Sequence, residues 1–182
     1  MELPRRSVHW ERRAPNWVVA AVSGLAAGAV LMVLDLLWSS IVDTGGPWRT
    51  SHMIAPIFLG ADVVQSTGFN FSIGVVAIAL AVHYALGIAF GLVLAAIMAP
   101  LHLDATVRRA LVTGAVFGLI LYVVNFFGVA RWFPWLADLR GWATVAAHLV
   151  FGMVAALLYW KLERTAPEPR SASRTHSPPS AS

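Results

Sequence analysis

Apolar residues form four long runs along this chain, and these runs dominate its pattern. They span about residues 17–42, 71–99, 107–130 and 141–160. A helix that crosses the hydrocarbon core of a bilayer needs about 20 apolar residues, so each run is long enough for one. An amphipathic helix of a soluble domain would instead carry polar residues along one face. The pattern predicts an all-α membrane protein, with a bundle of four transmembrane helices within residues 17–160.

The segments around these runs are predicted to lie outside the hydrocarbon. Residues 1–16 form a basic arm. Residues 43–69 form a long outer loop with a short helix broken at Pro56, whose apolar residues would rest in the membrane interface. Residues 131–140 form a second interfacial link rich in aromatic residues. Residues 161–182 are rich in Pro, Ser, Ala and Arg, which is typical of a disordered tail.

Small residues and histidines recur at matching places in the two halves of the chain. His83 is followed by glycines four and eight positions later, and His148 is followed by Gly152 and Ala156 at the same spacing. The run before each histidine also matches, with Gly24, Gly28 and Asp35 spaced like Gly114, Gly118 and Asn125. Residues four apart share one face of a helix, and small ones let helices approach closely. The pattern indicates an internal repeat of two tandem helical hairpins.

Composition narrows the possible chemistry. Of the 182 residues, 58% are hydrophobic and 12% are charged, and the mean hydropathy is +0.71, as expected of an integral membrane protein. The absence of cysteine excludes disulfides, thiolate metal sites and cysteine nucleophiles. The sequence has no metal-spaced histidine cluster, nucleophile elbow or phosphate-binding loop, so we predict no catalytic or metal-binding residue. The net charge of +4 comes from the flanks and indicates no nucleic-acid partner.

The distribution of Lys and Arg predicts the orientation in the membrane. If the N-terminus is cytoplasmic, the cytoplasmic segments carry ten basic residues: four in the arm, Arg108 and Arg109, and four in the tail. The outer segments then carry three, which are Arg49, Arg131 and Arg140. Basic residues are enriched on the cytoplasmic side of membrane proteins. We therefore expect both termini to be cytoplasmic.

The few polar side chains inside the runs are the candidate site. Asp35 lies on the same helical face as the glycines of its run, so we expect it to point into the bundle. At a rise of about 1.5 Å per residue, Asp35, Asn125 and His148 lie roughly 8–10 Å from the outer ends of their runs and can share a layer. By the same rise, His83 lies about 20 Å from the outer end of its run. This depth differs from that of His148, although the repeat makes the two histidines equivalent. His52, in the outer loop, is a further candidate.

Three functions fit this polar cluster. An accessory or structural membrane component would use it to fix helix packing, because interhelical hydrogen bonds contribute about 0.6–2 kcal/mol each in membranes. An electron-transfer protein would hold a b-type haem between His83 and His148. A transporter would use Asp35 to bind a small solute or a proton. We favour the first, whose expected partners are the lipid bilayer and either a second copy of the chain or a larger membrane complex.

Three parts of the sequence resemble a group of small bacterial inner-membrane proteins. They are Arg49–Gly60, Asn125–Gly128 with Phe133–Trp135, and Ala147–Gly152. The resemblance covers about Val18 to Trp160. Some members of the group carry sodium/solute symporter names, but these motifs have no assigned chemistry. The resemblance implies the four-helix architecture and a location in the bacterial inner membrane, and it implies no activity.

Overall fold

The computed structural model describes residues 13–42, 45–62 and 69–165, so most of the predicted arm and tail lie outside the described residues. The elements are α1 (Trp17–Ile41), α2 (Arg49–Ile54), α3 (Pro56–Leu59), α5 (Ile73–Met98), α6 (Val107–Val123), η1 (Val124–Gly128), η2 (Val129–Arg131), η3 (Pro134–Leu139) and α7 (Trp142–Thr165). The described residues contain no strand. Four helical segments, α1, α5, α6 extended to Arg131, and α7, are long and apolar enough to cross a membrane. The protein is a multi-pass membrane protein, and the predicted all-α four-helix bundle is confirmed.

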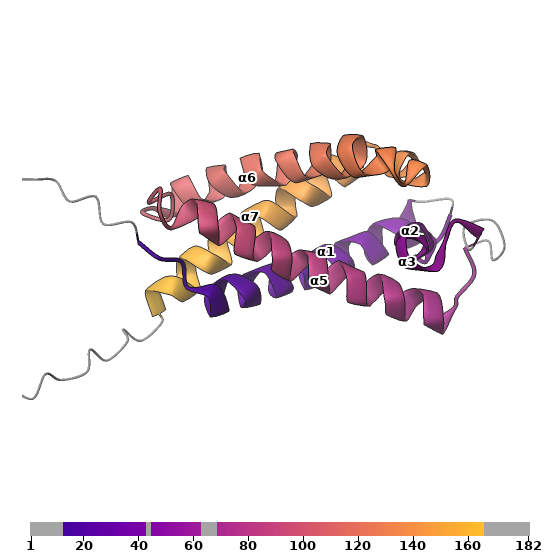
Figure 1. The fold of residues 1–182 in the computed structure, drawn as a ribbon, viewed down its shortest axis with the longest axis horizontal. Helices are drawn as coiled ribbons and strands as arrows, with labels where there is room; N and C mark the ends of the chain where they lie inside the picture. Colours follow the sequence, from indigo (N-terminus) through magenta and orange to yellow (C-terminus); the bar gives the residue numbers. More distant parts are fainter. Residues whose placement is uncertain (1–12, 43–44, 63–68, 166–182) are drawn as a thin grey trace, which may run out of the picture.

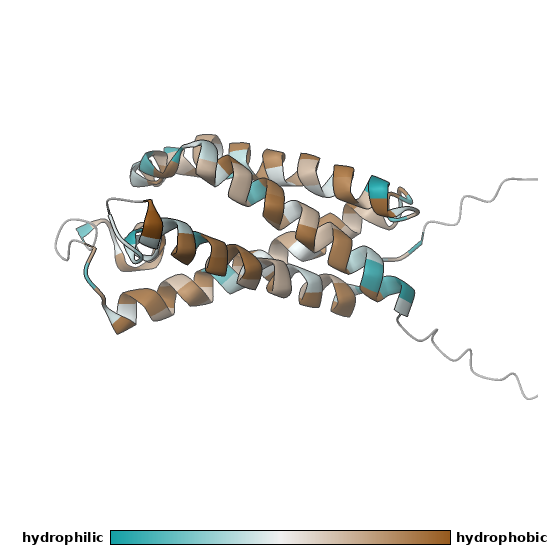
Figure 2. Ribbon diagram, turned by 180° about the vertical axis from the view of Figure 1, so that it is seen from behind, coloured by the Kyte–Doolittle hydropathy of each residue, from teal (hydrophilic) through white to brown (hydrophobic). Residues whose placement is uncertain are grey.

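The four long helices pack as two hairpins, α1 with α5 and α6 with α7 (Figure 1). α1 begins and α7 ends at the same end of the bundle, which we name the terminal end. The short helices α2, α3 and η1 to η3 lie at the opposite, distal end. Hydrophobic residues cover most of each long helix, and hydrophilic residues gather toward both ends (Figure 2). The two hairpins lie close together at the terminal end and apart at the distal end.

Glycines let α1 and α5 approach until their backbones touch. A Cβ atom added to Gly24 would overlap the carbonyl oxygen of Gly87 and lie 3.0 Å from the Cα atom of Gly91. A Cβ atom added to Gly91 would lie 2.6 Å from the carbonyl oxygen of Ala20. Larger residues at these points would push the helices apart. Because lipid tails are as apolar as leucine, such close packing is a main source of helix association in a membrane.

α6 and α7 make the same kind of contact with their own small residues. A Cβ atom added to Gly114 would overlap the carbonyl oxygen of Gly152 and lie 2.8 Å from the Cβ atom of Ala156. A Cβ atom added to Gly118 would overlap the carbonyl oxygen of His148. The closest approach within each hairpin therefore occurs at the small residues that recur every four positions.

The main apolar core lies in the terminal half of the bundle. Its buried side chains come from all four long helices: Ala20, Ala27, Leu94, Met98, Ala110, Phe117, Ala155 and Tyr159. Phe90 and Phe151 meet edge to face on its distal side, with ring centroids 6.3 Å apart. Because alanines supply many of these positions, the helices can cross at short distance here.

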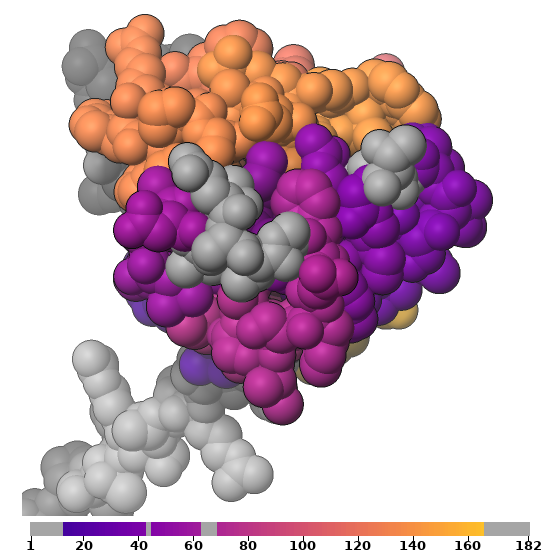
Figure 3. Space-filling model, turned by 90° about the vertical axis from the view of Figure 1, so that its right-hand side faces the viewer, coloured from indigo at the N-terminus to yellow at the C-terminus, as the bar shows by residue number. Residues whose placement is uncertain are grey.

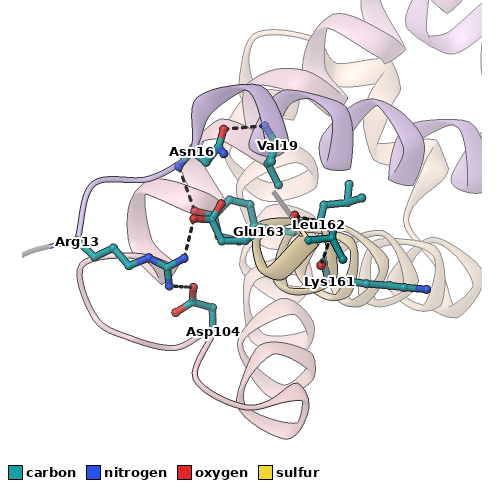
Figure 4. Close-up of polar contacts among 9 residues, drawn as sticks. Arg13, Asn16, Val19, Asp104, Lys161, Leu162 and Glu163 are labelled. Carbon is teal, nitrogen blue, oxygen red and sulfur yellow. Dashed lines mark hydrogen bonds and ion pairs between the residues drawn. The ribbon is translucent and has the colours of Figure 1, made fainter. Parts of the chain in front are cut away.

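Three charged residues join the helices at the terminal end, and we name them the terminal clamp (Figure 4). The guanidinium of Arg13 lies 2.8 Å from a carboxylate oxygen of Asp104 and 2.6 Å from one of Glu163. The side chains of Asp104 and Glu163 are 5% and 13% exposed, so water screens these pairs only in part. Partial burial lowers the pKa of Arg13, but the hydrogen bond to Glu163 and the nearby carboxylates outweigh it and raise that pKa above its usual value. The clamp connects the start of α1, the α5–α6 connection and the end of α7.

α7 continues to Thr165, so the prediction of a disordered tail directly after residue 160 is wrong for its first five residues. Four of these five residues are polar, and the charged side chains of two of them have partners elsewhere in the protein. Glu163 belongs to the terminal clamp, and Arg164 Nη2 donates to the carbonyl oxygen of Ala105 at 2.8 Å. The Arg164 guanidinium also lies 4.7 Å from the ring centroid of Trp160. Contacts with the rest of the protein therefore stabilise a final helical turn that composition alone does not favour.

The uniform pattern of the third apolar run predicts one regular α-helix, but the structure differs from this prediction. The α-helix ends at Val123 and continues through the π-helical turn η1 and the 3-10 turn η2. Such turns leave backbone groups without their regular partners. Arg140 Nε donates to the carbonyl oxygen of Phe126 within η1 at 2.8 Å, which satisfies one of these groups. Asn125, a candidate site residue, lies in this irregular turn.

The described part of the outer loop contains two short helices, α2 and α3, which meet at Ala55. Pro56 is the first residue of α3, as the predicted break requires. Proline is well tolerated there because the first residues of a helix have no intrahelical acceptor for their N–H groups. Ala55 packs with Val75 and Ala79 of α5, so this segment is attached to the first hairpin.

Candidate functional site

A cavity of about 570 Å³ lies between the two hairpins in the distal half of the bundle. All four long helices line it, with α1 contributing between Gly28 and Ser39 and α7 between Trp142 and Phe151. At a rise of about 1.5 Å per residue, these stretches make the cavity roughly 14–17 Å long. Seen from the distal end, the orange residues of η1 to η3 lie on one side, and the purple and magenta residues of α1, α2 and α5 lie on the other (Figure 3).

The cavity changes from apolar to polar along its length. Its inner part is lined by Leu86, Phe90, Leu121, Val150 and Phe151. Its mouth is lined by Asp35, Arg49, Thr50, Asp138 and Arg140. Trp38 and Trp142 flank the mouth, with ring centroids 4.8 Å apart and nearly perpendicular planes. A hydrophobic cavity with a few polar groups at one end is the usual form of a small-molecule site.

His148 and Asn125 form a polar pair on the cavity wall. His148 Nδ1 donates to the carbonyl oxygen of Thr144 at 2.9 Å, which leaves Nε2 of the neutral ring as an acceptor. Asn125 Nδ2 lies 3.4 Å from this Nε2 and donates to it. The ring also meets Tyr122 and Phe126 edge to face, with centroids 5.9 and 5.5 Å away. The predicted proximity of Asn125 and His148 is therefore present in the structure.

Asp35 lines the same cavity but does not join this pair. It is half-buried on α1, and its Oδ1 accepts a hydrogen bond from Thr50 Oγ1 at 3.1 Å. Thr50 belongs to α2, so Asp35 links the first helix to the short helix that follows it. The predicted orientation into the bundle is present, while its described hydrogen-bond partner is Thr50 rather than Asn125 or His148.

His83 also lines the cavity, on the opposite hairpin from His148. Its Nε2 donates to the carbonyl oxygen of Gly28 on α1 at 2.8 Å. The imidazole lies beside the Cα atom of this glycine, and a Cβ atom added there would lie 3.6 Å from Nε2, an ordinary van der Waals distance. His83 therefore joins the helices of its hairpin near the inner part of the cavity.

His52 is the one candidate that the structure places away from the cavity. It is fully buried in α2, and its Nδ1 donates to the carbonyl oxygen of Trp48 at 2.9 Å. Its ring faces Phe69 edge to face at 6.1 Å. Within the described residues its Nε2 has no hydrogen-bond partner.

Contacts between the two hairpins cross the mouth of the cavity. Trp135 Nε1 in η3 donates to the carbonyl oxygen of Met53 in α2 at 3.0 Å. Arg49 Nη2 in α2 donates to the carbonyl oxygen of Asp138 in η3 at 3.2 Å. The sequence marks Trp135 as an interfacial tryptophan, but its partner lies 82 positions away. Both acceptors are backbone carbonyls, which no side-chain motif reveals.

The Nε2 atoms of both candidate haem ligands are engaged in other contacts. Iron ligation needs two imidazole nitrogens with free lone pairs facing one centre. His83 Nε2 carries the proton that Gly28 accepts, and the lone pair of His148 Nε2 faces Asn125. Both rings would have to turn before their Nε2 atoms could share an iron. Across residues 13–42, 45–62 and 69–165, no three His, Asp or Glu side chains form a group that could hold a metal ion.

Comparison of the chain with models of protein families, with curated proteins and with solved structures found no match. The resemblance to small bacterial inner-membrane proteins therefore stays a prediction.

Proposed function

We propose that this multi-pass membrane protein binds a small amphipathic molecule in the cavity between its hairpins. The observation that carries the proposal is the cavity itself, which has about 570 Å³ of space, an apolar inner part and a polar mouth. Sites for small molecules commonly have volumes of about 300–1,000 Å³ and a few polar groups that fix orientation. The apolar part of the ligand would lie between Phe90 and Leu121, and its polar part would lie near Asp35 and Arg140.

The polar pair on the wall supports a ligand with a hydrogen-bonding group partway along its length. The contacts of Asn125 leave its side-chain oxygen as an acceptor, while His148 holds the amide in place through Nδ2. A buried polar group that stays unpaired is costly, so a purely hydrocarbon ligand would fit the part of the cavity beside Asn125 less well than an amphipathic one.

The test is mass spectrometry of the small molecules that stay with the protein in nanodiscs cut directly from the membrane. Ala147→Phe adds a ring to the cavity wall and should reduce the retained molecule about ten-fold, which corresponds to about 1.4 kcal/mol of binding free energy. The matched control is Ala89→Phe on the exposed face of α5, which should retain as much as the unchanged protein. Equal contents in all three proteins would contradict the proposal.

We also propose a bacterial inner membrane as the location, with both termini in the cytoplasm. Ten basic residues against three support the orientation, and the start of α1 and the end of α7 lie at one end of the bundle. A fluorescent protein that folds only in the cytoplasm should be bright when fused after residue 182 and dark when inserted after Ala61. The reverse result would overturn the orientation.

We propose further that the two hairpins are an internal repeat. Gly24 contacts Gly87 and Gly91 just as Gly114 contacts Gly152 and Ala156, and these are the positions that the sequence pattern pairs.

The structural role, transport through Asp35, and association with a second copy or a larger complex stay predictions. Flux into proteoliposomes that Asp35→Asn abolishes would favour transport.

A further inference from the structure

We propose that α2–α3 and η3 are the two halves of a lid that closes the cavity. The role of this lid in regulating ligand entry rests on the proposed function. The lid itself follows from how each half is attached and how the halves meet.

Each half is attached to its own hairpin by apolar packing. Ala55, between α2 and α3, packs against Val75 and Ala79 of α5. Leu136 of η3 packs with Phe126 and Ala130, which follow α6 directly. Each half would therefore move with its hairpin.

Among the described residues, the halves meet through few contacts. Two hydrogen bonds between described residues cross the mouth, from Trp135 to Met53 and from Arg49 to Asp138. Ile57 of α3 adds an apolar contact with the cluster around Leu136. A hydrogen bond contributes about 0.5–1.5 kcal/mol net, so the loss of either one would change the balance between a closed and an open mouth noticeably.

The opposite end of the bundle supplies the pivot. The terminal clamp and the alanine-rich core hold all four helices together there. The long helices are rigid, so a small change in the angle between the hairpins would part their distal ends while the terminal end stays packed. The cavity lies where that opening would be greatest.

The experiment measures how fast a thiol inside the cavity reacts with a charged, water-soluble methanethiosulfonate. The chain has no cysteine, so Ala147→Cys gives a single reporter on the cavity wall and Ala61→Cys gives one on the exposed distal surface. Both are measured in the full chain in nanodiscs. Trp135→Phe is then added to each, since it removes the indole N–H and keeps an aromatic ring. Trp132→Phe is the matched control, because Trp132 is 75% exposed in the same link.

The reaction rate at position 147 should rise about five-fold with Trp135→Phe, the factor that about 1 kcal/mol of hydrogen bonding provides. It should not change with Trp132→Phe, and the rate at position 61 should not change with either. The lid is overturned if Trp135→Phe leaves position 147 unchanged, or if position 147 of the parent reacts as fast as position 61. Faster reaction at both positions would indicate general loosening and would also overturn it.

This experiment fails separately from the test of ligand binding. Changed thiol access without any retained molecule would leave the lid in place and refute the ligand proposal. If Ala147→Phe displaces a retained molecule but Trp135→Phe leaves thiol access unchanged, the ligand proposal would stand and the lid would be refuted.

Discussion

The two ends of this bundle are held together by different interactions. At the terminal end, the alanine-rich core packs all four long helices together, and Arg13 pairs with the little-exposed carboxylates of Asp104 and Glu163 in the terminal clamp. At the distal end, the hairpins enclose a cavity, and the described residues join them through two hydrogen bonds to backbone carbonyls, the contact of Ile57 with the cluster around Leu136, and the edge-to-face pair of Trp38 and Trp142. One end of the bundle therefore provides most of the stability, which leaves the other free to carry a site. Substitutions at the two ends should therefore have unequal costs.

The largest effect is expected where α6 and α7 touch. In Gly152→Ala, the new Cβ atom would overlap the carbonyl oxygen of Gly114 and lie 2.9 Å from the backbone nitrogen of Gly118. The helices must separate, so the free energy of unfolding in mixed micelles should fall by about 1–3 kcal/mol. The control is Gly74→Ala, near the distal end of α5, where a Cβ atom has no neighbour within 4 Å. Equal stability of the two variants would show that close packing does not hold the hairpin.

A smaller effect is expected from the terminal clamp. Asp104→Asn keeps the shape of the side chain and removes its charge, so one ion pair with Arg13 is lost. Because Arg13 is 43% exposed, solvent screens the pair, and the unfolding free energy should fall by about 1 kcal/mol. Asp138→Asn is the control at the distal end, since the contact of Asp138 with Arg49 uses its backbone carbonyl. If both variants lose the same stability, the clamp has no special role.

The smallest effect is expected between the two ends, at His83. His83→Phe removes the hydrogen bond to the carbonyl oxygen of Gly28 but retains an aromatic ring, and should cost about 0.6 kcal/mol. Because both imidazoles are engaged in other contacts, absorption spectra of the purified parent and variant should both lack a Soret band. A Soret band in the parent that disappears in His83→Phe would restore the haem hypothesis.

The sequence predicted those features that local patterns encode. The four helices follow from the length of the apolar runs, and the contact between Gly24 and Gly87 follows from small residues at helical spacing. The polar cluster was predicted in part: Asp35, His83, Asn125 and His148 do line one cavity.

The sequence could not predict features that depend on contacts between distant residues. Arg13 and Glu163 are 150 positions apart, in segments that composition assigns to an arm and a tail. The position of Asp35 along its apolar run could not predict its hydrogen bond to Thr50, because that bond depends on where α2 lies in the fold. The apolar runs likewise contain no signal for the π-helical turn at Asn125 or for the cavity between the hairpins.

The most direct test of this account is a pair of spin-label distances in the full chain in nanodiscs. One pair, Phe58→Cys with Trp132→Cys, joins the hairpins at exposed distal positions, and the other, Trp17→Cys with Lys161→Cys, joins them at the terminal end. Trp135→Phe should lengthen and broaden the distal distance and leave the terminal distance unchanged. Distances that both stay fixed, or that change together, would contradict it.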